Sequence, residues 1–355
     1  MKILLTGGGT AGSVSPLLAI TEKLKENDPN VELFWLGTKK GPEKKMVAEY
    51  DIDFKTIPAG KLRRYFDLRN LVDIFRIGFS FVGSFFIILK FKPDVILSAG
   101  SFVSVPVIWA GWLLGKKLLI HQQDARPGLA NKLMAPFATK ITVTFKESLK
   151  HFPKKKTSWT GNPVRGEILR GDKERAIKRF GLKRDVPVLL VMGGGMGSAT
   201  INRVIIEALS QLTEFCQIIH LTAGKVQASS DSSPKHLRYH TIEFLDVHDM
   251  ADAYAVADVV VSRCGLSSLT ELSALGKPVI FIPLADTHQE DNAKLILEKK
   301  AGVVVWQKDL TLDKFIKIVN NIVLDKKSQL VLSQNISKVL PADASYKITQ
   351  IIKKL

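Results

Sequence analysis

Short apolar runs alternate with longer segments of helical periodicity along most of the chain. An apolar run of about four to eight residues between turn residues indicates a buried strand, and apolar positions three and four residues apart indicate a helix. Such alternation predicts parallel sheets joined by right-handed crossovers, the α/β class. Strands are predicted at residues 2–6, 31–36, 94–97, 117–121, 140–144, 187–192, 216–222, 239–243, 258–261 and 278–282.

Two glycine-rich turns, at residues 7–12 and 193–197, each follow a predicted strand and open a predicted helix. Glycine lets the backbone approach a ligand closely, and the free N–H groups of a helix N-terminus attract an anion, so each turn is a candidate phosphate site. Their recurrence predicts two Rossmann-like domains. Because open α/β sheets bind ligands at the carboxyl ends of their strands, we expect the active site in a cleft between the domains.

The first turn has the spacing Gly-x-Gly-x-x-Gly, which is also the fingerprint of dinucleotide-binding enzymes. That fingerprint includes an acidic residue about 20 residues further on, at the end of the second strand. Here the second strand runs into residues 37–40, Gly-Thr-Lys-Lys, with no carboxylate at its end. A nicotinamide or flavin site is therefore disfavoured, and a packing turn between strand and helix stays open as an alternative.

The length of 355 residues allows two domains of ordinary size, each with its own core. An Asn-Pro pair at 162–163 interrupts regular structure before a new charged helix, which indicates a boundary. We expect one domain at residues 1–163, a second at 164–340 and a helix within 341–355 that packs back on the first domain. The apolar residues of that helix are Ile348, Ile351, Ile352 and Leu355.

Composition is typical of a globular protein, with 46% apolar and 8% aromatic residues. The two cysteines, Cys216 and Cys264, imply no disulfide framework, and no Cys/His spacing matches a zinc site. Neither a metal nor a cofactor is therefore expected. The apolar run near the start of the sequence is too short for the core of a signal peptide, which predicts a cytosolic protein.

The chain is strongly basic, with 51 lysines and arginines against 34 aspartates and glutamates and a formal net charge of +17. Such a balance suits nucleic acid, an anionic membrane surface or phosphorylated substrates. The sequence has no helix-turn-helix, zinc-finger or RNA-binding motif, and its basic residues are not interleaved with aromatic ones. Nucleic acid is therefore not expected as a partner.

An apolar, phenylalanine-rich segment at residues 77–89 is flanked by cations. It is too short to cross a bilayer, which takes roughly 20 residues, but it can fill a core or lie at a membrane interface, and both interpretations stay open. A smaller apolar segment lies at residues 107–114. We expect an exposed patch that binds an anionic membrane surface, formed by Phe79, Phe85, Phe86 and Trp112. The flanking cations are Lys61, Arg63, Arg64, Arg69, Arg76, Lys90 and Lys92.

Seven motifs are distributed along the chain: Gly8-Gly9-Thr10-Ala11-Gly12-x-x-x-Pro16, Ser98-Ala99-Gly100-Ser101-Phe102-Val103-Ser104-x-Pro106, His121-Gln122-Gln123-Asp124, Gly161-Asn162-Pro163-Val164-Arg165, Gly193-Gly194-Gly195-x-Gly197, Arg263-x-Gly265-x-x-Ser268-x-x-Glu271 and His288-Gln289-Glu290-Asp291-Asn292-Ala293. In order and spacing they resemble the MurG family, the UDP-N-acetylglucosamine–N-acetylmuramyl-(pentapeptide) pyrophosphoryl-undecaprenol N-acetylglucosamine transferases of peptidoglycan synthesis. The resemblance covers almost the full length of the chain.

The resemblance implies a GT-B fold, in which two Rossmann-like domains face each other across a cleft. It implies an inverting transfer of GlcNAc from UDP-GlcNAc, on the C-terminal domain, to the muramyl 4-hydroxyl of lipid I, on the N-terminal domain, which forms lipid II. It also implies a peripheral protein on the cytoplasmic face of the cell membrane. Two alternatives remain: a GT-B transferase with another lipid-linked acceptor, and a non-catalytic homologue that binds UDP-sugars at the membrane.

For the donor, the resemblance assigns the diphosphate to Arg165 and Gly195, the uracil to the main chain of Leu245 and the ribose hydroxyls to Glu271. It assigns the GlcNAc hydroxyls and acetamido group to Gln289 and Asn292, with His288 beside them. The other substrate contacts that it implies are Thr10, Ala11, Gly12, Leu266, Ser267 and Ser268. The local sequence allows a different role for Glu271, because Ser-Leu-Thr-Glu at 268–271 is also the pattern of a capping box that opens a helix.

The first and third of these motifs depart from the family pattern. Ser13 stands where the family usually has histidine, and the usual His-Glu-Gln-Asn is His-Gln-Gln-Asp at 121–124. Transfer to a sugar hydroxyl needs a group that takes its proton. Ser13 and Asp124 are the candidate catalytic residues, and Asp124 is the candidate base because a serine hydroxyl needs help to act as one near neutral pH. A contact with the donor is the alternative role of Asp124. His121 and Asn131 are expected to be hydrogen-bonded structural residues.

Overall fold

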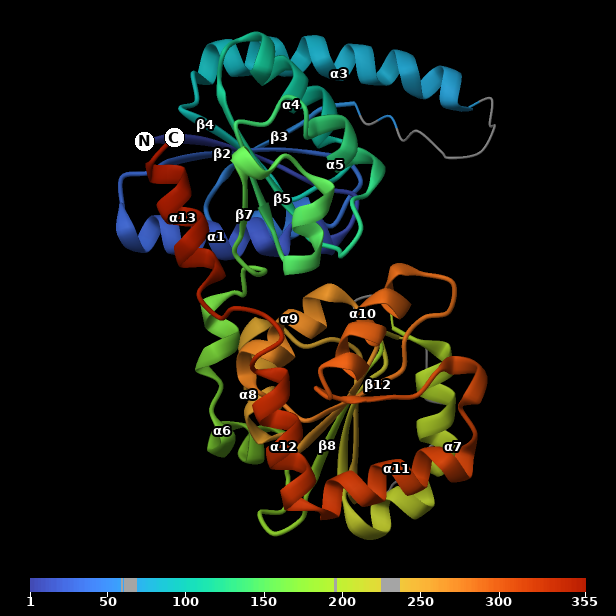
Figure 1. Cartoon of the computed structure of the whole chain (residues 1–355). Coiled ribbons are helices and arrows are strands. Elements are labelled where there is room, and N and C mark those ends of the chain that lie inside the picture. Colours follow the sequence, from blue (N-terminus) through green and yellow to red (C-terminus); the bar gives the residue numbers. More distant parts are fainter. Residues whose placement is uncertain (59, 61–68, 195–196, 225–236) are drawn as a thin grey trace. The chain divides into compact units, whose positions relative to one another are not determined.

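A computed structural model describes residues 1–58, 60, 69–194, 197–224 and 237–355. It divides into two compact units, one formed by residues 1–165 with 341–355 and the other by residues 166–340. Each unit contains one parallel β-sheet with helices on both faces, so the expected α/β class is confirmed (Figure 1). Among the described residues, no helix combines the length and the apolar character needed to span a bilayer.

The sheet of the first unit has seven parallel strands in the order β3-β2-β1-β4-β5-β6-β7. The strand order reverses between β1 and β4, which is where open α/β sheets bind ligands. The strands are β1 (Lys2–Thr6), β2 (Glu32–Gly37), β3 (Asp53–Thr56), β4 (Val95–Ser98), β5 (Lys117–Gln122), β6 (Lys140–Val143) and β7 (Thr157–Trp159). The helices are α1 (Ser15–Asn27), α2 (Glu43–Ala48), α3 (Arg69–Phe91), α4 (Ser104–Leu113), α5 (Leu129–Met134) and α13 (Ala344–Lys353), with 3-10 turns η1 (Ala11–Ser13), η2 (Lys146–His151) and η3 (Lys154–Lys156).

Both faces of this sheet are covered by helices (Figure 1). Because successive residues of a strand point to opposite faces, Ile3 and Leu5 pack with α1 and α13, whereas Leu4 packs with α3 and α4. Burial on both faces explains why these strands form continuous apolar runs in the sequence. Helix α13 belongs to this unit, since Ile348 and Ile352 are buried in the same cluster as the apolar face of α1.

The sheet of the second unit has six parallel strands in the order β10-β9-β8-β11-β12-β13, with its reversal between β8 and β11. The strands are β8 (Val188–Met192), β9 (Gln217–Leu221), β10 (Tyr239–Ile242), β11 (Val259–Ser262), β12 (Val279–Phe281) and β13 (Val303–Val304). The helices are α6 (Lys173–Phe180), α7 (Ala199–Phe215), α8 (Val247–Val256), α9 (Leu266–Leu275), α10 (His288–Glu298), α11 (Leu312–Leu324) and α12 (Lys326–Ile336), with 3-10 turns η4 (Gly166–Arg170) and η5 (Gln307–Asp309).

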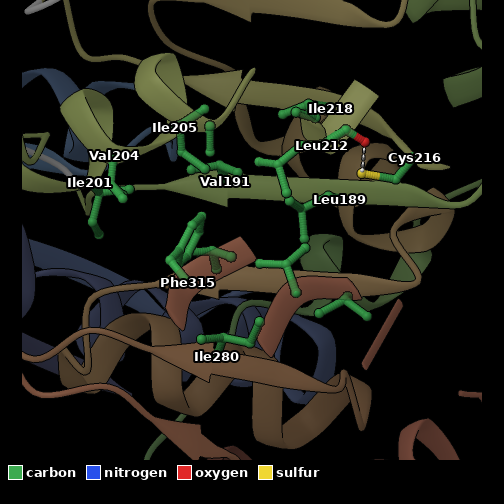
Figure 2. Packing of buried hydrophobic residues seen from close by; sticks show 14 of the residues in the cluster. Leu189, Val191, Ile201, Val204, Ile205, Leu212, Cys216, Ile218, Ile280 and Phe315 are labelled. Carbon is green, nitrogen blue, oxygen red and sulfur yellow. Dashed lines mark hydrogen bonds between the residues drawn. The ribbon is translucent and has the colours of Figure 1, made fainter. Parts of the chain in front are cut away.

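A large core of the second unit lies between its sheet and helices α7 and α11. Figure 2 shows Ile205 of α7 and Phe315 of α11 packed with Val191 of the central strand. At the end of α7, the buried Cys216 thiol donates to the Leu212 carbonyl oxygen at 3.2 Å. Burial raises the pKa of Cys216 to about 12, so the thiol stays protonated at neutral pH.

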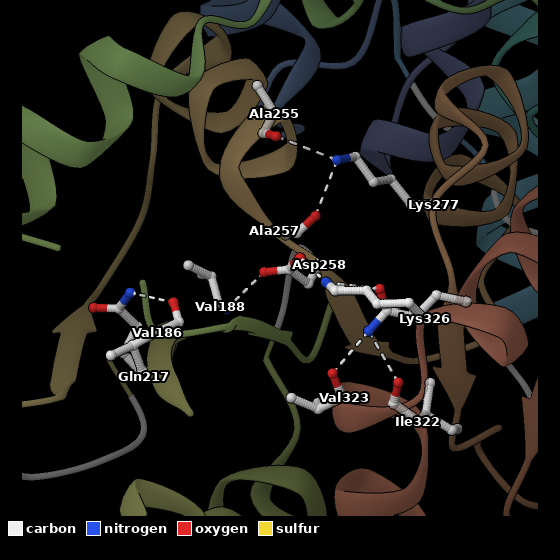
Figure 3. Close-up of polar contacts among 11 residues, drawn as sticks. Val186, Val188, Gln217, Ala255, Ala257, Asp258, Lys277, Ile322, Val323 and Lys326 are labelled. Atoms are coloured by element: carbon white, nitrogen blue, oxygen red, sulfur yellow. Dashed lines mark hydrogen bonds and ion pairs between the residues drawn. The ribbon is translucent and has the colours of Figure 1, made fainter. Parts of the chain in front are cut away.

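Polar side chains secure the amino edge of this second sheet (Figure 3). Asp258 accepts from the first backbone N–H of β8 at 2.9 Å and from the Lys326 ammonium at 2.8 Å. Lys277 donates to the carbonyl oxygens of Ala255 and Ala257, at 3.3 and 3.0 Å, where a cation complements the C-terminus of α8. The second glycine turn follows β8 and lies at the opposite, carboxyl edge.

The ten predicted strands are confirmed, each with both ends within one residue of the prediction. The sequence patterns missed β3, β7 and β13. These three are edge strands of four, three and two residues, and their residues are partly exposed. A short strand that buries little apolar surface leaves no apolar run to detect.

Candidate functional site

The second glycine turn leads directly into helix α7. Gly194 and Gly197 have positive φ values of 80° and 65°, and a Cβ atom at Gly193 would collide with the backbone nitrogen of Ser198. Ser198 caps α7 by accepting from the N–H of Ile201 at 3.3 Å. Gly195, the predicted diphosphate contact, lies outside the described residues. The described part of the turn has the glycine conformations and the helix start that an anion site requires.

The loop after β11 carries Arg263, which is 7% exposed. Its Nη1 donates to the carbonyl oxygens of Ile282 and Pro283 at 3.0 and 3.1 Å and to Oε1 of Gln307 at 2.9 Å. Burial lowers the pKa of the guanidinium, because the cation has lost most of its hydration. These contacts fix a positive charge at the carboxyl edge of the sheet.

The capping-box prediction for residues 268–271 is wrong. Helix α9 begins at Leu266 with Gly265 as its N-cap, so Glu271 lies in the second turn rather than at the N3 position of the helix. Its carboxylate Oε2 accepts from the hydroxyl of Tyr254 on α8 at 2.9 Å. Burial of Leu266 and Leu269 starts the helix earlier than the local capping pattern indicates. Ser267 is partly exposed and Ser268 is buried in the same first turn.

The start of helix α10 carries the three residues predicted to contact GlcNAc. His288 is exposed, and Gln289 is half-buried and accepts from the N–H of Leu284 at 3.1 Å. Asn292 is 1% exposed, and its Nδ2 donates to the carbonyl oxygen of Cys264 at 3.1 Å. Asn292 therefore ties α10 to the loop after β11, and its buried Oδ1 has no partner within the described part of the chain.

Leu245 follows the last strand residue of β10 by three positions and is half-buried just before Asp246, the N-cap of α8. Leu245, Glu271 and Gln289 thus all follow strands of one sheet and belong to its carboxyl edge, as does the second glycine turn. Arg165 is the last residue of the first unit before residue 166. The structure brings Leu245, Glu271 and Gln289, which are predicted to contact the donor, to one edge of the second unit.

In the first unit, a buried carboxylate occupies the first glycine turn. Glu43 is fully buried, and its Oε2 accepts from the N–H of Gly9 at 3.0 Å while Oε1 accepts from the N–H of Thr38 at 2.6 Å. A Cβ atom at Gly8 would collide with this carboxylate. The Gly9 amide is therefore engaged within the protein, and the carboxylate would repel a phosphate there. Nothing in the sequence around Glu43 indicated this contact.

Ser13 is buried behind the same turn, and its hydroxyl lies within hydrogen-bond reach of the carbonyl oxygens of Thr10 and Gly8, at 3.2 and 3.3 Å. Ser101 also donates to the Gly8 carbonyl, at 2.8 Å. These contacts give the Ser13 hydroxyl a role in holding the turn. Thr10 is exposed, Gly12 is half-buried, and Ala11 belongs to η1.

The loop after β5 carries Asp124, which is half-buried. Gln122 is 2% exposed and holds this loop: its Nε2 donates to the carbonyl oxygens of Asp124 and Arg126 at 2.7 and 3.2 Å. Its Oε1 accepts from Nδ2 of Asn131 at 2.6 Å. A glutamate at position 122 has no N–H to donate to these carbonyls. The amide of Gln122 therefore holds the main chain of the loop that carries the Asp124 carboxylate.

Each unit also contains a fully hydrogen-bonded, buried histidine. His121 Nε2 contacts Oδ1 of Asn162 at 2.9 Å and its Nδ1 contacts Thr142 Oγ1 at 2.9 Å. His220 Nε2 contacts Oδ1 of Asn202 at 3.1 Å, and its Nδ1 contacts the Tyr239 hydroxyl at 2.9 Å. Because an amide oxygen only accepts, Nε2 carries the proton in both. Burial lowers the pKa of each histidine from 6.5 to about 4.

We therefore expect the free energy of unfolding to decrease as the pH falls below about 6.5. The unfolded chain binds protons at these histidines first, since their folded pKa of about 4 lies below the unfolded value. Each should cost about 1.4 kcal/mol per pH unit between pH 6.5 and 4. Urea unfolding at pH 7.5 and pH 5 measures this. His220→Asn should reduce the dependence, because it removes one of the two buried imidazoles.

Helix α3 has two different faces. Asp73, Ser80, Ser84 and Ile88 are buried, and Phe85 is half-buried against the core. The opposite face carries what we call the outer apolar stripe, five exposed residues spaced by four and three positions: Phe75, Phe79, Val82, Phe86 and Leu89. Phe79 and Phe86 are 70% and 64% exposed, as expected, whereas Phe85 is only partly exposed, contrary to expectation, because it packs against the buried cluster of this unit. One face of the segment therefore helps to fill the core, as one interpretation predicts, and the other face is exposed.

Helix α4 packs beside α3 and exposes Trp112, at 54%, and Leu113. Positive charge is concentrated in the same unit. Residues 1–165 and 341–355 contain 29 lysines and arginines against 14 aspartates and glutamates, whereas residues 166–340 contain 22 against 20. The outer apolar stripe therefore belongs to a strongly cationic unit, and the second unit is nearly neutral.

Comparison with known proteins gives full-length similarities. Residues 3–143 match the glycosyltransferase family 28 N-terminal domain, and residues 188–349 match its C-terminal domain. The chain is 41% identical over 326 residues to a UDP-N-acetylglucosamine–N-acetylmuramyl-(pentapeptide) pyrophosphoryl-undecaprenol N-acetylglucosamine transferase of Bacillus anthracis, covering 90% of this chain and 91% of the relative. It is 38% identical to one of Bacillus cereus, covering 100% and 97%.

Among solved structures, MurG of Acinetobacter baumannii matches with a TM-score of 0.77 and 23% identity, covering 100% of this chain and 99% of that one. The UDP-GlcNAc 2-epimerase of Neisseria meningitidis, solved with UDP-GlcNAc bound, matches with a TM-score of 0.69 and 14% identity over the full length of both chains. These structural likenesses confirm the GT-B fold. The sequence identities over nearly all of the chain establish that it belongs to the MurG family of glycosyltransferases.

Proposed function

We propose that this protein transfers GlcNAc from UDP-GlcNAc to the muramyl 4-hydroxyl of lipid I and so forms lipid II. Membership of the MurG family supports the reaction. The observation that carries the donor assignment is the grouping of the second glycine turn, Glu271 and Gln289 at the carboxyl edge of one sheet. That edge is where doubly wound sheets hold nucleotides.

In this reaction the acceptor oxygen attacks the anomeric carbon while the bond from that carbon to the UDP oxygen breaks. A single displacement inverts the configuration. The second glycine turn and the N-terminus of α7 stabilise the negative charge on the departing diphosphate, since backbone N–H groups and the helix dipole favour an anion. Asp124 takes the proton of the attacking hydroxyl, and Gln122 holds the loop that carries it.

An assay of UDP release with and without lipid I tests the reaction. We expect release that depends on lipid I. Release only with a different lipid-linked acceptor would indicate the related transferase. Binding of UDP-GlcNAc with no release for any acceptor would indicate a non-catalytic homologue.

We expect UDP-GlcNAc to raise the melting temperature, and Glu271→Ala to remove most of that rise. Loss of a charged hydrogen-bonding group in a binding site costs about 1.5–3 kcal/mol, so the affinity for UDP-GlcNAc should decrease by roughly 10- to 100-fold. Differential scanning fluorimetry measures both effects. Glu298→Ala, an exposed carboxylate near the far end of α10, is the matched control and should change neither. Equal stabilisation by NADH would contradict the donor assignment.

The first unit also supports peripheral binding to an anionic membrane. Exposed apolar residues at helical spacing, with cations around them, bind a lipid interface by burying apolar surface and by attraction to anionic headgroups. The outer apolar stripe, Trp112 and the excess of cations in this unit meet both requirements. The lipid-linked acceptor would then reach the protein from the membrane surface.

A further inference from the structure

We propose that Tyr254 is a positioning residue of the donor site, which orients the carboxylate of Glu271 and thereby sets the affinity for the ribose hydroxyls of UDP. The inference rests on the proposed function, since it takes Glu271 as the ribose contact. Tyr254 itself would not touch the ligand.

The contact joins two helices that follow different strands of the second sheet. Tyr254 belongs to α8 and is fully buried, and its hydroxyl donates to Oε2 of Glu271 on α9 at 2.9 Å. The hydroxyl also lies 3.5 Å from the sulfur of Met192, the last residue of the central strand β8. The tyrosine ring is thus held by the core, and its O–H reaches a half-buried carboxylate at the carboxyl edge.

A buried phenol is well suited to fix a carboxylate. A glutamate side chain has several rotatable bonds, and ordering it on ligand binding costs conformational entropy. An O–H donor from a fully buried ring removes much of that freedom before the ligand arrives, which is the general advantage of preorganisation. A hydrogen bond to a charged acceptor is also stronger than one between neutral groups. With Oε2 held by Tyr254, the carboxylate presents a defined orientation to the ribose diol.

The discriminating measurement is the ratio of affinities for UDP and for 2′,3′-dideoxyuridine diphosphate, which lacks both ribose hydroxyls. We expect the unmodified protein to bind UDP roughly 100-fold more tightly than the dideoxy compound, because two hydrogen bonds to a charged acceptor are lost. Tyr254→Phe should reduce this ratio to about 10-fold by weakening UDP and leaving the dideoxy compound nearly unchanged. A merely structural role of Tyr254 would weaken both ligands equally. Isothermal titration calorimetry gives the four affinities.

Tyr239→Phe is the matched control, because it removes another tyrosine hydroxyl bonded within the same unit, the partner of His220. It should leave the ratio unchanged. In the double variant Tyr254→Phe with Glu271→Gln, the ratio should equal that of Glu271→Gln alone, since Tyr254 acts through Glu271.

Two failures can be told apart. If Glu271→Gln leaves the ratio of UDP to dideoxy affinity intact, the donor assignment of Glu271 is overturned. If Glu271→Gln lowers the ratio and Tyr254→Phe does not, the positioning role alone is overturned. If Tyr254→Phe unfolds at the assay temperature, the same affinities are measured for Tyr254→His, which keeps a ring with a polar donor. A ratio of UDP to dideoxy affinity near that of the unmodified protein supports the proposal. An equal loss of affinity for both ligands opposes it.

Discussion

Asp124→Asn is expected to lower kcat with lipid I by about 100-fold or more, while the affinity for UDP-GlcNAc changes little. General-base catalysis contributes about 10²–10⁴-fold, and an amide cannot take the proton of the attacking hydroxyl. Gln122 can hold the loop in this variant too, because it binds the main-chain carbonyl of residue 124 rather than its side chain. Steady-state UDP release with varied donor and acceptor concentrations measures both parameters.

Asp53→Asn, an exposed carboxylate on the edge strand β3, is the control and should leave kcat unchanged. A raised donor KM with an intact kcat for Asp124→Asn would make Asp124 a donor contact and leave the base to be found elsewhere. Ser13→His gives a complementary test, since a gain in rate with lipid I would indicate that the acceptor of this protein is the one used by the family. In this variant the imidazole replaces a buried hydroxyl that holds the first glycine turn, so the folding of the variant is checked by its melting temperature.

The second large effect is expected at the membrane. Phe79→Ser combined with Phe86→Ser should weaken binding to anionic vesicles by about 100-fold, because each change removes an exposed phenylalanine that would be buried in the lipid interface. Neither side chain fills the core, so the melting temperature should stay nearly unchanged. Binding of the unmodified protein should also weaken as salt is raised from 0.05 to about 0.5 M, since screening reduces the attraction between cations and headgroups. Vesicle co-sedimentation measures both.

Leu330→Ser combined with Val331→Ser is the matched control, because these residues of α12 are 59% and 55% exposed in the nearly neutral second unit. That pair should leave vesicle binding unchanged. Equal loss of binding for both pairs would show that exposed apolar area in general, rather than the outer apolar stripe, holds the protein on lipid. Phe85→Ser should instead lower the melting temperature, since Phe85 packs against the core of the first unit.

Sequence patterns predicted the strands well because most strands are buried on both faces and form continuous apolar runs. The patterns missed strands that bury little apolar surface, such as β13. They also did not predict which residues of α3 are buried, because the two faces of that helix differ. Phe85 and Phe86 are neighbours in the sequence, yet Phe85 packs against the buried cluster of the first unit and Phe86 is exposed. The buried face of α3 carries Ser80 and Ser84 while phenylalanines lie on its exposed face, so the positions of its apolar residues alone do not tell which face is buried.

The motifs predicted the residues of the candidate site, but they did not predict the contacts that hold those residues in place. Glu43, Gln122 and Tyr254 each hold a residue or turn of the candidate site, and each contact depends on how separate elements pack. Local sequence even favoured the wrong role for Glu271, because the capping pattern is a short-range signal. The start of α9 is decided by burial of its apolar residues, which only the folded unit provides.

The return of α13 to the first unit makes that unit discontinuous, with the second unit inserted between its two parts. During synthesis, residues 1–165 leave the ribosome long before residues 344–353, an interval of about 10–40 s at ordinary elongation rates. Until then the apolar face of α1 lacks Ile348 and Ile352. The nascent first unit therefore completes its core after the second unit has been made, and a chain truncated before residue 344 would carry that exposed surface permanently.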